Sequence, residues 1–187
     1  MSENEVVRYR ADPNRSRFTV RAFAGGMLSA FAHNPTFAIR GFTGEIEFAP
    51  EAIERSSLRL QIKAEALELM DDVNAKDQRE IERLMREEVL ETNRYPDIIF
   101  ESTSASGTKV SEGQYRIKIT GKLTLHGVTN NCTIDAQMWA MPESLRAQGE
   151  FPLRQTDYKI KLVSAAGGTI KVKDELKFSF DIVASKV

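Results

Sequence analysis

The stretch from Tyr115 to Met138 reads YRIKITGKLTLHGVTNNCTIDAQM, and it decides the fold. Apolar side chains recur at every second position from Tyr115 to Leu125, and again from Cys132 to Met138. A period of two is typical of a strand that is buried on one face. The pair His126-Gly127 lies between the two runs as a turn signal. The stretch therefore predicts two neighbouring strands joined by a tight turn.

The same alternation recurs along the rest of the chain, in the segments Arg15–Phe23, Leu58–Ala66, Leu145–Leu153 and Leu176–Ile182. Turn signals separate the runs at Ser106-Gly107, Glu112-Gly113 and Gly167-Gly168. Strands of this kind, joined by short turns, favour an antiparallel sheet. Closing that sheet on itself removes its exposed edges. We therefore expect an all-β protein built as an antiparallel barrel.

One segment, Asn74–Leu90, has helical periodicity instead. Its spaced apolar residues are Ile81, Leu84, Met85 and Val89. Asn74 is a suitable N-cap, and Asp77 places negative charge in the first turn. Tyr95-Pro96 terminates any helix that reaches it. We predict one amphipathic helix lying across the barrel, and a shorter helical turn at Gly26–Ala32.

Length and charge limit the functions to consider. The 187 residues, 41% of them hydrophobic, predict a single domain over residues 1–187 with a short flexible N-terminus at residues 1–6. The 26 basic and 27 acidic residues nearly cancel, which argues against nucleic acid as a partner and against electrostatic docking on anionic lipid. No apolar run has the length of a membrane span. The acidic, polar start and the single cysteine predict a cytoplasmic protein.

Residues that carry catalytic chemistry are sparse. His33 and His126 each lie beside a turn, and Cys132 lies in strand-like alternation on an apolar face. A zinc site needs three or four ligands, and a buried cysteine is usually a small hydrophobe, so we predict no metal, no cofactor and no enzymatic activity. The alternative is an enzyme acting on a small apolar substrate through His33 or His126 with a carboxylate. It requires the two imidazoles to converge on one point.

Periodicity does not determine whether the barrel interior is filled or hollow. Many of the ten phenylalanines fall on the apolar parity of their strands. A barrel of about eight strands is just wide enough either to be filled by side chains or to hold one small ligand. The pattern does not separate a filled core from a lined cavity.

Several motifs, in order along the chain, resemble those of the YceI-like family of lipid- and polyisoprenoid-binding proteins. They are Tyr9–Phe18 (YRADPNRSRF), Gly41–Gly44 (GFTG), Arg94–Thr103 (RYPDIIFEST), Leu123–Thr129 (LTLHGVT) and Lys173–Phe180 (KDELKFSF). The resemblance extends over nearly the whole chain, from Val7 to Ala184. It implies an elongated, lipocalin-like barrel around a hydrophobic pore, and dimers are common among such proteins.

The resemblance implies a carrier or sequestering protein for a polyisoprenoid or fatty-chain lipid, and a homodimer. The residues expected to line the pore are Phe18, Val20, Phe37, Ile39, Leu60, Ile62, Phe100, Ile117, Ile119, Ile134, Met138, Phe178 and Phe180. Those expected at its mouth are His33, Asp77, His126 and Asp157.

Two segments depart from the family pattern. In Lys76–Leu84 the family's histidine is absent and Asp77 is the part that matches, and Gly25–Pro35 replaces another family motif. Both departures put the identity of the ligand in doubt more than the fold. A further alternative is an interaction module with a filled core, in which the helix Asn74–Leu90 docks a partner or a second copy.

Overall fold

The computed structural model describes residues 5–25, 34–165 and 170–187. Eight antiparallel strands form a closed barrel, because the first strand pairs both with its neighbour and with the last strand. In their order around the barrel these strands are β1 (Val7–Ala11), β5 (Phe42–Phe48), β6 (Ser57–Lys63), β8 (Asp97–Ser111), β9 (Gln114–Leu125), β10 (Val128–Ala140), β11 (Ser144–Arg154) and β14 (Glu175–Lys186). The predicted all-β barrel is confirmed.

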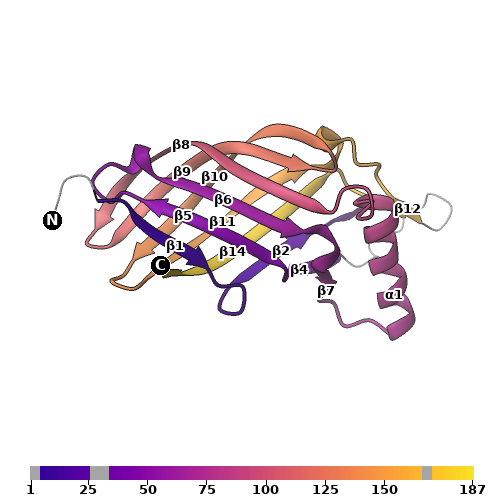
Figure 1. Cartoon of the computed structure of the whole chain (residues 1–187). Helices are drawn as coiled ribbons and strands as arrows, with labels where there is room; N and C mark the ends of the chain where they lie inside the picture. Colours follow the sequence, from indigo (N-terminus) through magenta and orange to yellow (C-terminus); the bar gives the residue numbers. More distant parts are fainter. Residues whose placement is uncertain (1–4, 26–33, 166–169) are drawn as a thin grey trace.

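Shorter strands lengthen the barrel toward one end. β2 (Arg17–Arg21) pairs with β14, β4 (Thr36–Ile39) with β2, and β7 (Leu67–Leu69) with β4. A small separate sheet contains β12 (Ser164–Ala165), β13 (Ile170–Val172) and β3 (Ala24–Gly25). The helix α1 (Ala75–Leu84) stands beside this end, and the described chain begins and ends toward the opposite end (Figure 1). We call the two ends the helix end and the far end.

The helix forms where the sequence predicts it. The Asn74 side chain accepts hydrogen bonds from the backbone N–H groups of Lys76 and Asp77, at 3.0 and 2.9 Å, and so caps the first turn. The helix continues as a π-helical turn over Met85–Val89. Met85 is buried against the barrel while the residues of the first turns are exposed. None of the helices in the described ranges is both long and apolar enough to cross a bilayer.

Two local predictions differ from the structure. Ser106-Gly107, expected to be a turn, lies within β8, and Gly107 is directly opposite Ile117 of β9. A Cβ at Gly107 would lie 2.3 Å from the carbonyl oxygen of Arg116, so the glycine permits a close approach of two strands. The run Leu58–Ala66 is not one strand: β6 ends at Lys63, and a 3-10 turn over Ala64–Ala66 leads into β7. The predicted helical turn at Gly26–Ala32 and the turn at Gly167-Gly168 lie outside the described residues.

The buried residues form two apolar clusters. The larger one occupies the middle of the barrel and the helix end, and contains Phe18, Phe100 and Leu123 together with Met85 and Leu90 of the helical segment. The smaller one lies at the far end. Its buried members are Tyr9, Phe48, Tyr115, Ile117, Met138, Leu145 and Ala184. Ile119 packs against both clusters.

Candidate functional site

A cavity of about 200 Å³ lies inside the barrel. Several side chains that face inward are only half-buried, among them Ile119, Ile134 and Phe180. All three line the cavity, and Ile119 and Ile134 are absent from the lining of the outer surface grooves, so their residual exposed surface faces the interior. A barrel whose side chains filled it completely would bury these residues fully. The structure therefore answers the question that periodicity left open: the interior is a lined cavity.

The alternation of apolar residues along the strands correctly predicted most of the residues that line this cavity. Twelve of the thirteen residues expected to line the pore do line it, and Phe37 does not. Phe37 is instead buried in the larger apolar cluster, on β4, where it stands opposite Leu69 of β7. The same parity could have added many further wall residues. Those include Leu58, Ile98, Leu123, Ala136, Phe151, Leu153, Leu176 and Ile182.

An aromatic cluster forms one side of the wall. The rings of Phe151 and Phe178 stack with their centroids 4.9 Å apart, and Phe18 contacts Phe178 and Phe180 at 6.2 and 6.5 Å. Phe18 also meets the ring of Phe42 edge to face at 5.9 Å. Flat faces of this kind adapt to a chain-like apolar molecule without requiring a hydrogen-bonding partner.

Cys132 lines the cavity as well. Burial raises the pKa of its thiol, because the thiolate would lose its hydration. The thiol is therefore mostly protonated at neutral pH and is a weak nucleophile. Its place on the inward parity of β10 agrees with the interpretation of Cys132 as a small hydrophobe.

Few polar side chains reach the cavity, and sequence reasoning did not single them out. Gln155 lies at the helix end, is only 3% exposed, and donates from Nε2 to the carbonyl oxygen of Lys173 at 2.9 Å. It shares the inward parity of Phe151 and Leu153, which could have revealed it. At the far end Glu47, Ser56 and Ser57 contribute to the wall. The Glu47 carboxylate pairs with the exposed Arg8, and the Gln155 amide is bonded to the backbone, so a molecule in the cavity would meet an almost wholly apolar surface.

His126 joins three segments at the helix end. Its Nδ1 lies 3.2 Å from the carbonyl oxygen of Tyr158, and its Nε2 lies 2.5 Å from Oε2 of Glu91. The Tyr95 ring packs on the imidazole with centroids 4.6 Å apart. Glu91, His126 and Lys159 all have positive φ, between 46° and 56°. Positive φ costs conformational free energy for any residue that has a Cβ. Three such residues close together therefore depend on the surrounding contacts to hold their backbone in place.

The structure brings together only part of the predicted mouth. His126 and the segment of Asp157 are neighbours, since Asn130, on the same hairpin as His126, donates from Nδ2 to the Asp157 carbonyl at 2.7 Å. The side chains of Asp157 and Asp77 are exposed, and Asp77 lies in the first turn of α1, hydrogen-bonded by Asn74. None of His126, Asp157 and Asp77 lines the cavity. His33 lies outside the described residues, so convergence of the two histidines stays untested.

Both ends of the cavity are occupied by apolar side chains. At the helix end Val89 and Leu90 of the π-helical segment form part of the wall. At the far end the rings of Phe48 and Tyr115 meet edge to face with centroids 5.0 Å apart. Burial raises the pKa of the Tyr115 hydroxyl, and likewise that of Tyr158 at the helix end to about 12. Within the described part of the chain, no group of three or more His, Cys, Asp or Glu side chains could hold a metal ion.

These features define the class of protein: a closed antiparallel β-barrel that surrounds an apolar cavity. The chain belongs to the YceI-like family, whose domain it matches over residues 9–184. The family predicted from the ordered motifs is thereby confirmed. No curated protein matches the chain in sequence.

Solved structures share the fold at low sequence identity. BcnA of Burkholderia cenocepacia superposes with a TM-score of 0.69 at 16% identity, over 92% of this chain and 98% of its own. A polyisoprenoid binding domain from Saccharophagus degradans, implicated in plant cell wall breakdown, gives 0.68 at 13% identity, over 97% and 99% of the two chains. The YCEI protein of Campylobacter jejuni gives 0.59 at 17% identity, over 80% and 83%.

Proposed function

We propose that this protein binds a long-chain apolar ligand, a polyisoprenoid or fatty-chain lipid, in the barrel and acts as its carrier or sequestering protein. The observation that carries the proposal is the unfilled cavity with its apolar wall. Removing apolar surface from water contributes about 25 cal/mol per Å², so a chain enclosed by such a wall gains affinity along its whole length. The likeness to a polyisoprenoid binding domain supports the same ligand class.

The volume of the cavity bears on how the ligand lies. About 200 Å³ is smaller than the roughly 300–1,000 Å³ typical of pockets that enclose a drug-sized molecule. A long chain therefore either displaces half-buried side chains such as Ile119 and Ile134 or extends beyond the cavity. We expect affinity to rise with chain length until the enclosed section is filled, and then to level off.

We further propose that the protein is not a catalyst. Both ring nitrogens of His126 are engaged, one with the Tyr158 carbonyl and one with Glu91, and the ring does not line the cavity. An interior molecule should accordingly be recovered from the protein chemically unchanged. Recovery of a cleaved or oxidised product would instead support the enzyme alternative.

Extraction and titration test the binding proposal. The purified protein is extracted with organic solvent and the extract analysed by mass spectrometry, and ligand-free protein is titrated with polyprenyl alcohols of increasing length. Ile134→Trp places a large side chain in the cavity and should abolish binding, whereas Thr133→Trp, on the outer face of the same strand, should not. An extract without lipid, together with no binding in the titration, would remove the proposal.

The single cysteine gives a second measurement. A ligand in the cavity covers Cys132 and should slow its modification by a thiol reagent, without changing the reaction of the denatured chain. The cytoplasmic location and the homodimer stay predictions. Fractionation of cells and sedimentation at high concentration test them.

A further inference from the structure

The barrel wall is incompletely paired at one place, between β10 and β11. β10 pairs with β9 along residues 128–139, and β11 pairs with β14 along its whole length. The two strands pair with each other over only four residue pairs, the last being Gln137 with Gln148. Beyond it, β10 and β11 run on without pairing to each other. They still touch next to the rung, since a Cβ at Gly149 would lie 2.5 Å from the carbonyl oxygen of Asp135. The unpaired interval clear of this contact covers residues 131–134 and 151–154. We call this interval the β10–β11 slot.

The slot is bounded at both ends. The rung Gln137–Gln148 closes one end. At the other, the hydrogen bond from Asn130 to the Asp157 carbonyl ties the start of β10 to the segment after β11. Four residues of strand span about 13 Å at roughly 3.3 Å per residue, which is long enough to admit a single hydrocarbon chain.

The residues of the slot suit an unpaired edge. Pro152, exposed in the middle of β11, has no backbone N–H to contribute to a ladder, and proline within a strand is tolerated where pairing is absent. On the inner side, Cys132, Ile134, Phe151 and Leu153 all line the cavity. The slot therefore lies directly over the apolar interior.

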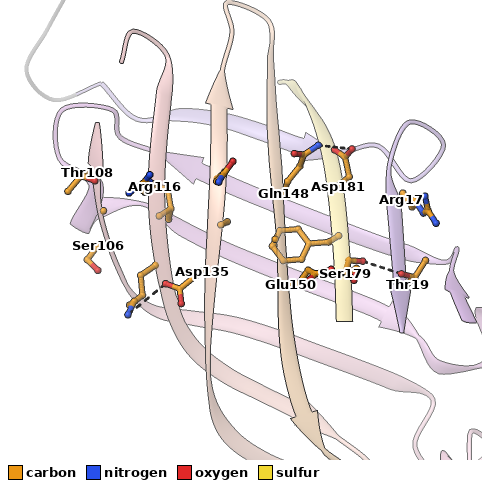
Figure 2. A pocket seen from close by; sticks show the side chains of 17 residues that line it. Arg17, Thr19, Ser106, Thr108, Arg116, Asp135, Gln148, Glu150, Ser179 and Asp181 are labelled. Atoms are coloured by element: carbon orange, nitrogen blue, oxygen red, sulfur yellow. Dashed lines mark hydrogen bonds and ion pairs between the residues drawn. The ribbon is translucent and has the colours of Figure 1, made fainter. Parts of the chain in front are cut away.

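A groove of about 1120 Å³ crosses the outer face of the barrel at the closed end of the slot (Figure 2). Its lining includes a row of polar residues that stand directly opposite one another on successive strands. The row runs Thr108, Arg116, Gln137, Gln148, Asp181 and Arg17. The middle pair of this row, Gln137 and Gln148, is also the last pair that joins β10 to β11. Ile117, Ala136 and Phe180 line both this outer groove and the inner cavity, so a single layer of residues divides them.

The charges of the outer groove are unequally paired. All three of its carboxylates have a cationic partner: Asp135 with Lys118 at 3.7 Å, Glu150 with Lys177 at 2.8 Å and Asp181 with Arg146 at 2.6 Å. The Arg146 guanidinium holds the pKa of Asp181 below its ordinary value, which keeps that carboxylate charged and engaged. Arg17 and Arg116 form no ion pair with any residue that the structure describes. Arg116 stands on β9, at the closed end of the slot, whereas Arg17 stands on β2, four strand spacings or about 19 Å away at roughly 4.8 Å per strand. A single anion bound beside the slot would therefore meet the unneutralised guanidinium group of Arg116.

We propose that a single-chain amphiphile enters the cavity sideways through the β10–β11 slot and leaves its anionic head in the outer groove, near Arg116. This inference rests on the proposed function and adds to it a route and a class of head group. Apolar side chains occupy the described ends of the barrel, Val89 and Leu90 at one and Phe48 and Tyr115 at the other. The slot reaches the cavity without displacing either set.

Closing the slot tests the route. In a Cys132→Ala background, Thr133→Cys and Pro152→Cys place thiols on the outer faces of the two strands, to be joined by oxidation or by a short bis-maleimide. The matched control, Lys122→Cys with Asn131→Cys, joins β10 to β9 across an existing rung. Uptake of cis-parinaric acid, a fluorescent long-chain carboxylate, is followed by stopped flow. We expect the slot cross-link to slow uptake at least roughly tenfold, since passage then requires another opening of the wall, and the control cross-link to leave it unchanged.

Head-group variants test the outer groove. Arg116→Gln should weaken equilibrium binding of cis-parinaric acid about tenfold, the loss expected for one charge-assisted contact, and should leave binding of the corresponding alcohol unchanged. Arg17→Gln, at the remote end of the groove, should leave binding of both unchanged. Arg59→Gln, an outer-face arginine paired with Glu101 and outside the groove, is the control.

The outcomes separate the two proposals. If neither the acid nor the alcohol binds the unaltered protein, the proposed function fails. If both bind, but the slot cross-link leaves the uptake rate unchanged, the lateral route is overturned while the function stands. Equal loss of acid and alcohol in Arg116→Gln would overturn the anionic head site.

Discussion

The two ends of the barrel are closed in different ways. At the far end the closure consists of side chains from the barrel strands themselves, with Phe48 2% exposed and Leu145 1% exposed. At the helix end it consists of a separate segment, α1 with its π-helical turn, which His126 ties to the barrel through Glu91. A closure made by strands can open only if the barrel unfolds there. One made by an attached segment can loosen while the strands stay paired.

The largest effect should come from the far end. Phe48→Ala removes a buried ring that meets Tyr115 edge to face, and should lower the free energy of unfolding by about 3–5 kcal/mol, as expected for loss of a core phenylalanine. Urea denaturation measures this change in the free energy of unfolding. Val110→Ala, on an exposed side chain of β8, is the control and should change stability by less than about 0.5 kcal/mol. A loss below about 1 kcal/mol for Phe48→Ala would show that this end is not a rigid closure.

A smaller and more local effect is expected at the helix end. Leu90 is buried and lines the cavity, so Leu90→Ala should cost about 2–3 kcal/mol, near the lower end of the range for buried leucine because the helical segment can relax. Amide hydrogen exchange should accelerate over residues 75–95 and remain slow in β9 and β10. Equal acceleration in the strands would contradict the distinction between the two ends.

The sequence predicted the wall of the barrel better than the contacts between segments for a physical reason. Alternation is local to each strand, and it places Ile117, Met138 and Phe180 on the inner wall without knowledge of the neighbours. The contact between His126 and Glu91 joins residues 35 positions apart and depends on how the helical segment returns to the barrel. The extent of pairing between β10 and β11 is likewise a property of the assembled sheet. In the sequence, Pro152 is the residue that could have indicated the missing pairing, because proline has no backbone N–H to donate.

Substitutions at His126 separate the contribution of the turn from that of its hydrogen bonds. His126→Ala loses both bonds and puts an ordinary residue at positive φ, so it should cost about 2 kcal/mol. His126→Asn keeps a residue that tolerates the left-handed conformation in a two-residue turn. It should recover part of the loss, and the remainder measures the bonds to Glu91 and Tyr158. Thermal denaturation of both variants provides the comparison. Equal stability of the two would mean that the hydrogen bonds, not the turn, account for the effect.

The smallest effect concerns pH at the helix end. Asp174 accepts from the backbone N–H and the hydroxyl of Thr156, at 2.8 and 2.7 Å, and from Arg154 at 3.0 Å. The backbone hydrogen bond, followed by that of the Thr156 side chain, holds the pKa of this carboxyl below its ordinary value of 3.8. Because the folded protein binds the proton less readily than the unfolded chain, the stabilisation is complete above that ordinary value. It is lost as the pH falls through the lowered pKa.

Asp174→Ala should therefore cost on the order of 1 kcal/mol at pH 7, the net contribution of a few partly exposed hydrogen bonds, and progressively less below about pH 4. Urea denaturation of the native protein and the variant between pH 3 and pH 7 measures the difference. Phe48→Ala should cost the same at every pH, because its contribution comes from apolar burial alone. If the loss from Asp174→Ala is as large at pH 3 as at pH 7, the carboxylate charge does not stabilise the helix end, and the two closures differ in packing only.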